Sequence, residues 1–325
     1  MEMQPPVTVF IPFHEDAPFL ERAIGSVRAQ TLENIEILCI DDGSTDGSVA
    51  IAEEFARGDG RIRILHNESN LGINRTRCRG IREARGEFIF SLDGDDALEP
   101  NIASIALGYA RKLRVDIVEF QERIHTNGMN MHWRLQDKTA NGKVRREPLK
   151  YLLHQHILCG HLHHRMVRRE VYLAALDLLG DAFCNASISL YEDLAHTVAI
   201  CKVADCWTKI NQIGYHYFTR RGSISKPDDT TISAEKLRQL IAGQIVVIHR
   251  ILEILHHRQR PILLRFAALH LFPALEWLQK LLSPGDYADF LAPFLGQNKF
   301  GKIFSLEKFL PAKLLATPPE EVIFT

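Results

Sequence analysis

The sequence has no excess of charge of either sign, because 39 lysines and arginines stand against 40 aspartates and glutamates. This balance argues against a polyanionic partner such as nucleic acid. The six cysteines form no CxxC pair, which favours reduced, packing cysteines in a cytoplasmic protein over a disulfide framework. No uncharged apolar run is long enough to cross a bilayer, and the first six residues lack the basic and apolar pattern of a secretory signal.

Short apolar runs alternate with helical patterns over the first 120 of the 325 residues. This rhythm predicts an α/β fold with a mostly parallel sheet flanked by helices. After this point the pattern becomes irregular, and Asn127-Gly128 and Asn141-Gly142 indicate hairpin turns. Residues 232–282 have a helical pattern. The expected strands are 7–11 (stopped by Pro12), 35–40, 61–65, 87–92 and 115–120, and the expected helices are 17–30, 44–57, 74–85 and 101–113.

Carboxylates follow two of these strands at the point where each strand ends. Asp41-Asp42 closes the second strand, and Asp93-Gly94-Asp95-Asp96 closes the fourth. Ligands of open α/β sheets bind at the carboxyl ends of the strands, so we expect both acidic tips at one crevice. Carboxylates in such a position repel one another unless a divalent cation or hydrogen-bond donors compensate. The pattern therefore predicts a metal–diphosphate site.

Five segments in one order carry a family resemblance: 7–12 (VTVFIP), 37–48 (ILCIDDGSTDGS), 70–72 (NLG), 86–89 (GEFI) and 92–96 (LDGDD). Together they closely resemble family 2 glycosyltransferases of the GT-A (nucleotide-diphospho-sugar transferase) fold. The resemblance implies a catalytic domain over residues 1–228, with a nucleotide-sugar half to about 115 and an acceptor half over 116–228. Residues 229–325 are expected to form a helical C-terminal region.

The resemblance also implies how the donor is held. Asp41 and Asp42 are expected to contact a uridine-type nucleoside. Asp93-Gly94-Asp95 matches the DXD motif of the fold, so Asp93 and Asp95 are expected to hold Mn²⁺ or Mg²⁺ against the diphosphate. Asp96 is expected to cap the next segment or to support the metal ligands. The other donor contacts expected are Pro12, Phe13, His14 and Glu15, where the family usually has a small apolar residue and Tyr-Asn, together with Arg75, Arg220 and Arg221. For Arg75 the alternative is a solvated basic face paired with Glu83 and Glu87.

The segment Tyr191-Glu192-Asp193 resembles the element that supplies the catalytic base, with Tyr191 in place of the usual glycine. Inversion at an anomeric carbon needs a carboxylate that takes the proton of the acceptor hydroxyl. We therefore expect Asp193 as the base and Glu192 as an orienting neighbour. The alternative is that both acids interact only with the dipole of a helix N-terminus.

Two further segments remain open. His161, His163 and His164, with His154 and His156, have spacings that can ligate zinc, but we interpret them as acceptor-pocket or solvent-facing histidines. The apolar, weakly basic stretch 261–282 predicts either a peripheral membrane contact or a helix that packs on the core or on a second copy in a homodimer.

The expected function is thus inverting, metal-dependent transfer of a sugar from a nucleotide diphosphate donor, UDP-linked by resemblance, to a carbohydrate hydroxyl. The acceptor is expected to be a carbohydrate or a lipid-linked glycan of surface polysaccharide or lipooligosaccharide, at the cytoplasmic face of the membrane. A catalytically silent nucleotide-sugar-binding module is the alternative. A dinucleotide-dependent oxidoreductase is excluded, because 11–14 (IPFH) stands where its glycine-rich turn would be.

Overall fold

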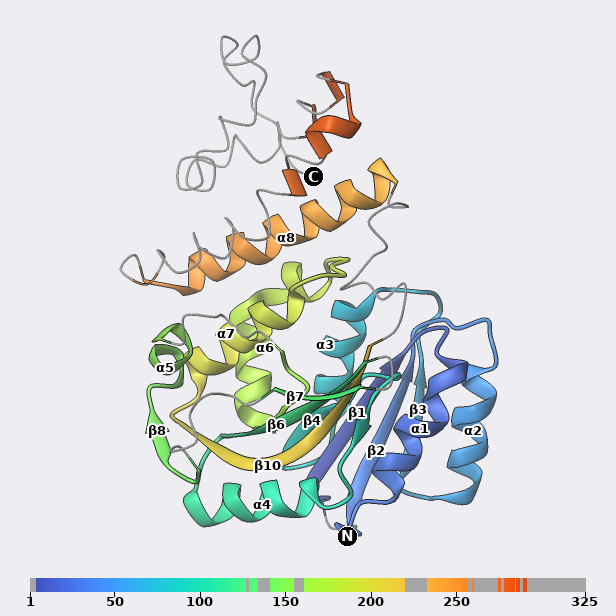
Figure 1. Ribbon diagram of the computed structural model, residues 1–325, viewed down its shortest axis with the longest axis vertical. Coiled ribbons are helices and arrows are strands. Elements are labelled where there is room, and N and C mark those ends of the chain that lie inside the picture. Colours follow the sequence, from blue (N-terminus) through green and yellow to red (C-terminus); the bar gives the residue numbers. More distant parts are fainter. Residues whose placement is uncertain are drawn as a thin grey trace.

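The computed structural model describes residues 4–126, 129–133, 141–154, 161–219 and 233–256, with shorter stretches between 259 and 290. Within them the chain forms one sheet covered by helices on both faces (Figure 1). The strands are β1 (Val7–Phe13), β2 (Ile35–Asp41), β3 (Ile62–His66), β4 (Phe88–Ser91), β5 (Ala97–Leu98), β6 (Ile117–Thr126), β7 (Met129–Trp133), β8 (Val144–Arg146), β9 (Arg165–Arg168) and β10 (Cys206–Phe218). The helices are α1 (Ala17–Arg28), α2 (Ser48–Gly58), α3 (Ile73–Glu83), α4 (Ile102–Leu113), α5 (Pro148–His154), α6 (Arg169–Cys184), α7 (Glu192–Val203) and α8 (Ala234–Ile254).

The sheet has the order β3-β2-β1-β4-β9-β6-β10-β5, with β7 paired to β6 and β8 paired to β10. The first four strands are parallel, as the sequence predicts. The second half is mixed, because the short strand β9 runs antiparallel to both β4 and β6. β9 therefore joins two parallel units, β3-β2-β1-β4 and β6-β10, into one sheet. The β6–β7 pairing confirms the hairpin expected around Asn127-Gly128.

Alternating side chains of β1 divide the core into two layers. Val7, Val9 and Ile11 pack with the buried residues of α1, α2 and α4, whereas Phe10 packs on the opposite face with those of α3, α6 and α7. The sequence predicts that this strand stops at Pro12, but the strand continues to Phe13. The missing N–H of Pro12 costs no ladder bond, because it faces β4, whose pairing with β1 ends earlier at Ser91.

Helix α3 approaches the sheet closely through a glycine. A Cβ on Gly80 would lie 2.6 Å from Cδ1 of Ile40 and 2.9 Å from Cδ2 of Phe10. Any larger residue would push the helix away from β1 and β2. This close packing fixes the height of α3 over the strand ends, where its one deeply buried arginine points (see below).

Helix α8 lies across α7 and α6 and buries Leu237, Ile241 and Ile248 against them (Figure 1). Of the stretch 261–282, only 274–275 and 278–282 are described, and there Leu275 and Leu278 are fully buried in the same core. These two side chains favour the packed alternative over a membrane contact. Among the described residues, no helix is both long and apolar enough to cross a bilayer.

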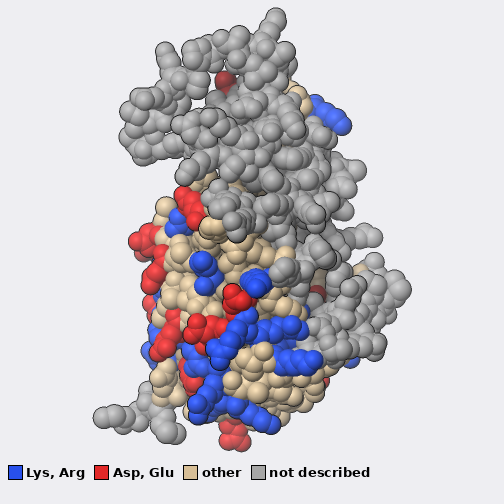
Figure 2. Space-filling model, turned by 90° about the vertical axis from the view of Figure 1, so that its left-hand side faces the viewer, with Lys and Arg blue, Asp and Glu red and all other residues tan. Residues whose placement is uncertain are grey.

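Charges on the described surface are mixed, in agreement with the balanced composition. Figure 2 shows lysines and arginines interspersed with acidic side chains on the face that lies to the left in Figure 1, where α4, α5 and β8 are found. The described cysteines are all free, and all but Cys206 are buried.

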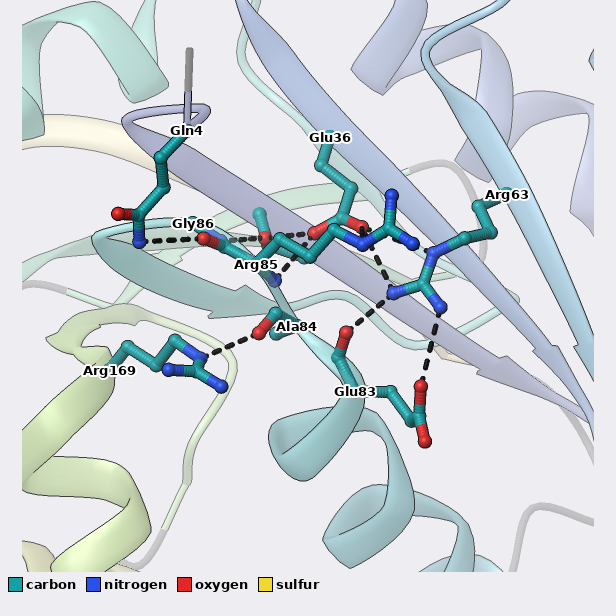
Figure 3. A network of polar contacts seen from close by, with 9 residues as sticks. Gln4, Glu36, Arg63, Glu83, Ala84, Arg85, Gly86 and Arg169 are labelled. Carbon is teal, nitrogen blue, oxygen red and sulfur yellow. Dashed lines mark hydrogen bonds and ion pairs between the residues drawn. The ribbon is translucent and has the colours of Figure 1, made fainter. Parts of the chain in front are cut away.

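Beside the starts of the strands, at the edge opposite the acidic tips, a buried carboxylate of β2 joins this strand to three other segments (Figure 3). Glu36 of β2 accepts hydrogen bonds from Thr8 Oγ1 (2.5 Å), Arg63 Nη2 (3.0 Å) and the backbone N–H of Arg85 (2.8 Å). Arg63 also donates to the backbone oxygen of Glu83 at the end of α3. The network joins β1, β2, β3 and the turn before β4, so its role is structural.

Replacing Glu36 by alanine should therefore lower the free energy of unfolding by roughly 3 kcal/mol, because it leaves a buried hydroxyl and a backbone amide without their acceptor and removes one carboxylate partner of Arg63. Chemical denaturation of the purified protein measures this loss. The matched control is Glu53→Ala on α2, an exposed glutamate whose loss should change stability by less than about 0.5 kcal/mol. Equal stability of the two variants would contradict a structural role for Glu36.

Candidate active site

The acidic tips of β2 and β4 lie at one edge of the sheet, on either side of the end of β1. The N–H of Asp42 donates to the backbone oxygen of Phe13 (2.9 Å), and the N–H of Leu92 donates to that of Phe10 (3.1 Å). Gly94 packs so tightly on the segment after β1 that a Cβ there would lie 2.8 Å from Oδ2 of Asp16. The absence of a side chain at Gly94 thus lets the acidic turn pack closely against the end of β1.

Asp41 and Asp42 are both buried but have different surroundings. Both oxygens of Asp42 are engaged, by Nδ2 of Asn67 (2.7 Å) and by the N–H groups of Leu71 and Gly72 (2.9 Å each). Asp42 therefore anchors the loop before α3. Asp41 accepts a hydrogen bond from the N–H of Ser44 (2.9 Å) and lies 3.3 Å from Nδ1 of the exposed His66. Of the two, Asp41 has the greater capacity left for a ligand.

The expected donor contacts Pro12, Phe13, His14 and Glu15 lie at the end of β1 and in the loop after it. Pro12 and Phe13 are buried, whereas His14 is partly exposed and Glu15 is exposed. Glu15, in a left-handed conformation (φ 54°), accepts a hydrogen bond from the N–H of Thr45 at 2.6 Å. It thus joins the loop after β1 to the loop after β2, at the rim beside Asp41.

Arg77 of α3 connects the DXD turn to the expected catalytic acids. Its Nη2 lies 2.7 Å from Oδ1 of Asp93, and its Nη1 donates to Oε1 of Glu192 at the start of α7. The side chains of Arg77 and Glu192 are only 10% and 6% exposed, whereas that of Asp93 is 28% exposed. A buried guanidinium with two carboxylate partners thus brings together segments that are about 100 residues apart in the chain.

The charges of this cluster shift one another's protonation. Burial alone would disfavour the charge of Arg77, but Asp93, Glu192 and Asp193 hold its pKa above the ordinary value. Burial would likewise raise the pKa of Asp93, yet Arg77 and then His163 keep it below its usual range. Burial raises the pKa of Glu192 to about 7 despite Arg77, with Asp193 adding to the rise. Glu192 can therefore carry a proton near neutrality, while Asp93 stays ionised.

Asp193 is placed differently from its neighbour. Its side chain is 24% exposed, accepts a hydrogen bond from the N–H of Leu194 (2.8 Å) and lies 3.9 Å from Nδ1 of the exposed His161. The turn before it is left-handed, with Tyr191 at φ 64° and ψ 10°. This is the conformation that favours glycine, so Tyr191 adopts a backbone geometry that is uncommon for a residue with a side chain. Asp193 is thus the more accessible of the two acids.

Asp96 supports the acidic turn from behind. It is fully buried, accepts hydrogen bonds from the hydroxyl of Tyr215 (2.7 Å) and the N–H of Phe218 (2.8 Å), and has a pKa well above its ordinary value because of burial and then of Asp95 and Asp93. The Tyr215 hydroxyl also accepts from the N–H of Asp93 (3.3 Å). Asp95 is partly exposed, and its backbone oxygen accepts from Arg22. Asp93 and Asp95 are therefore the carboxylates of the turn that reach solvent.

Some expected residues lie elsewhere. Arg75 donates to the backbone oxygen of Asn185 and does not contact the acidic turn among the described residues. Arg220 and Arg221 lie outside the described residues. His163 and His164 are buried rather than solvent-facing, whereas His161 is exposed. His156 and the side chain of His154 lie outside the described residues.

Sequence reasoning did not include Arg77 among the candidate site residues. The signal was present, because Asn74, Arg77, Cys78 and Ile81 form a stripe at helical spacing and are all buried. A lone arginine in a core-facing stripe indicates carboxylate partners elsewhere in the fold.

Comparison with known proteins agrees with this geometry. The family model described as Glycosyl transferase family 2 matches residues 8–174, about half of the chain. The cholesterol galactosyltransferase of Borreliella burgdorferi is 29% identical over 228 residues, which cover 67% of this chain and 62% of that relative. In two further curated relatives the aligned segment covers 28% and 33% of the relative's own length, so the chain spans less than two thirds of each of these proteins.

Solved structures share the fold at low identity. S. aureus TarS in complex with UDP has a TM-score of 0.62 at 17% identity, covering 95% of this chain and 84% of that one. The mannosyltransferase PcManGT from Pyrobaculum calidifontis, in complex with GDP-Man and Mn²⁺, has a TM-score of 0.51 at 16% identity and covers 95% and 85%. The fold is therefore of the GT-A type. The strand order, the acidic turn and the family match lead to one conclusion: this chain belongs to glycosyl transferase family 2.

Proposed function

We propose that the chain transfers a sugar from a UDP-sugar to a carbohydrate hydroxyl with inversion, with Asp193 as the base. The observation that carries this proposal is the Arg77 bridge, which holds the DXD turn beside Glu192-Asp193. A donor diphosphate at Asp93 would then present its sugar near the carboxylate of Asp193. The UDP complex of the TarS structure supports a uridine donor.

The residues of the acidic turn fit a hard divalent cation. Asp93 and Asp95 offer oxygen ligands that reach solvent, and Arg77 hydrogen-bonds to Oδ1 of Asp93 rather than enclosing the whole carboxylate. Mg²⁺ and Mn²⁺ prefer such ligands and use few of them from the protein. The Mn²⁺ in the PcManGT complex supports this assignment. When bound, the ion would neutralise the charge of the departing diphosphate.

The chain's own residues supply the other steps. Asp193 accepts the proton of the acceptor hydroxyl while that oxygen forms a bond to the anomeric carbon, and the bond from this carbon to the diphosphate breaks on the opposite face. Glu192, held by Arg77 and able to keep a proton near neutrality, orients the site rather than competing as base. On the donor side, Asp41 faces the nucleoside, with Pro12, Phe13, His14 and Glu15 along its rim.

We assign the catalytic unit to residues 1–228 and the helical C-terminal region to 229–325. The acceptor in this proposal is a carbohydrate or a lipid-linked glycan of surface polysaccharide or lipooligosaccharide. The cholesterol galactosyltransferase among the relatives supports an acceptor with a lipid part. The competing proposal, a silent nucleotide-sugar-binding module, is tested by the turnover of the Asp193→Asn variant.

Donor binding should depend on Asp95. In wild-type protein, UDP with Mn²⁺ is expected to raise the melting temperature, since a ligand at 100 times its Kd stabilises by about 2.7 kcal/mol. Neither UDP nor Mn²⁺ alone should do so. Asp95→Ala should abolish the joint shift, because the ion loses one of its two protein carboxylates. A thermal-shift screen of nucleotide sugars with and without Mn²⁺ measures this.

The control for this screen is Glu53→Ala, which removes an exposed carboxylate of α2 far along the chain from the turn and should leave the joint shift intact. A persisting Mn²⁺-dependent shift in Asp95→Ala would exclude the acidic turn as the cation site.

A further inference from the structure

A second cluster of ligating side chains lies beside the acidic turn and plays no part in the proposed reaction. Glu122 of β6, His163 and His164 each offer one ligand atom, and these three atoms lie within 4.8 Å of one another. His163 Nε2 is 2.6 Å from Oε2 of Glu122. The cluster joins the middle of β6 to the segment that leads into β9.

His164 is the least explained member of this cluster. It is 2% exposed, and neither ring nitrogen has a hydrogen-bond partner. Leaving buried polar atoms without partners costs about 1–3 kcal/mol, so such a group calls for an explanation. Burial and then Arg165 keep the pKa of His164 well below its ordinary value, so the ring is neutral and its lone pair is available. The two nearby cations, Arg165 and Lys209, are each paired with Glu119 (3.2 and 2.8 Å).

We propose that Glu122, His163 and His164 bind a zinc ion, at a site separate from the Asp93–Asp95 turn. Two imidazoles and one carboxylate suit zinc, whereas the all-oxygen ligands of the turn suit Mg²⁺ or Mn²⁺. Tetrahedral zinc separates its ligand atoms by roughly 3.3 Å. The ion would therefore replace the close contact of His163 with Glu122 and draw His164 inward by small side-chain movements. This assignment reverses the interpretation that the sequence alone favours.

The proposed zinc site lies next to residues that contact both the acidic turn and the proposed base. The ring of His163 packs against that of Tyr215 in a tilted arrangement, with the ring centroids 4.3 Å apart. The hydroxyl of Tyr215 hydrogen-bonds to the backbone N–H of Asp93 and to the carboxylate of Asp96. Two residues before His163, His161 lies beside Asp193. Zinc would thus fix the segment between the acidic turn and the base. Three protein ligands leave a fourth position for water.

The test is metal analysis of the full-length chain purified without a His tag and dialysed against micromolar zinc. We expect about one zinc per wild-type chain, and bound Co²⁺ should show the visible absorption of a tetrahedral site. Glu122→Gln and His164→Gln should weaken zinc binding by more than the roughly 10–100-fold typical of changing an outer partner. Glu122 is partly exposed, so Glu122→Gln is expected to fold even if His164→Gln does not.

Two controls separate the alternatives. His161→Gln, an exposed neighbour, should keep the zinc, and so should Asp95→Ala, which removes the proposed donor-site ligand. Zinc that disappears with Asp95→Ala would belong to the donor site and would overturn the proposal. Wild-type protein that holds far less than one zinc, or a folded Glu122→Gln protein that holds as much as wild type, would overturn it as well. None of these readouts depends on transferase activity.

Discussion

Asp193→Asn should reduce turnover of the donor by about 10²–10⁴-fold, the usual contribution of a general base. Asparagine keeps the size of the side chain and can still accept the hydrogen bond from the N–H of Leu194, but it cannot take the acceptor's proton. Release of UDP from a panel of UDP-sugars, with added acceptor or with water in its place, measures the effect. The thermal shift by UDP and Mn²⁺ should persist, because Asp193 does not contact the donor in the proposed arrangement.

A matched control is Asp181→Asn, which changes an aspartate on α6 whose side chain is 91% exposed. Its turnover should equal that of wild type. If Asp193→Asn retains turnover within about threefold of wild type, the base lies elsewhere. If the wild-type protein binds donors but turns over none of them, and the substitution changes nothing, the silent binding module is the better description.

Arg77→Met should destabilise the protein by about 3 kcal/mol and remove its activity. The substitution leaves Glu192, which is 6% exposed, without its cation, and breaking a buried ion pair costs about 3–5 kcal/mol. We expect the lower end of this range because Asp93 is 28% exposed and partly solvated, and because Glu192 can take up a proton when its cation is removed. Activity should fall with stability, because the bridge that holds the DXD turn beside α7 is gone. Denaturation curves and UDP release measure the two effects.

The same helix provides the control, because Arg82 is 45% exposed and lies 3.5 Å from the solvated Asp181. Arg82→Met should cost less than about 1 kcal/mol, as surface ion pairs do. Adding Glu192→Gln to Arg77→Met should recover part of the lost stability, since the unpaired buried carboxylate is removed, without recovering activity. If Arg77→Met proves as stable as Arg82→Met, the bridge is not a structural element.

Much of the N-terminal half could be predicted because its signals are local. Parallel strands buried on both faces appear as continuous apolar runs, and the expected strands at 35–40, 61–65 and 87–92 lie within one or two residues of β2, β3 and β4. The strand at 115–120 was predicted too short, since β6 runs to Thr126 through partly exposed residues. The prediction that Pro12 ends the first strand was wrong, because a missing N–H disrupts a strand only where a partner strand would accept a hydrogen bond from it.

The order of the five family motifs along the chain determined the family and the fold, and it selected the acids that we propose for the site. The partner of those acids was decided by the tertiary structure alone. Arg77 meets Asp93 and Glu192 only because Gly80 lets α3 approach the sheet and β9 brings the second half of the chain against β4. The proximity of Glu122 to His163 and His164 has the same origin. Contacts between distant segments depend on how elements pack, and the spacing of residues along the chain does not contain that information.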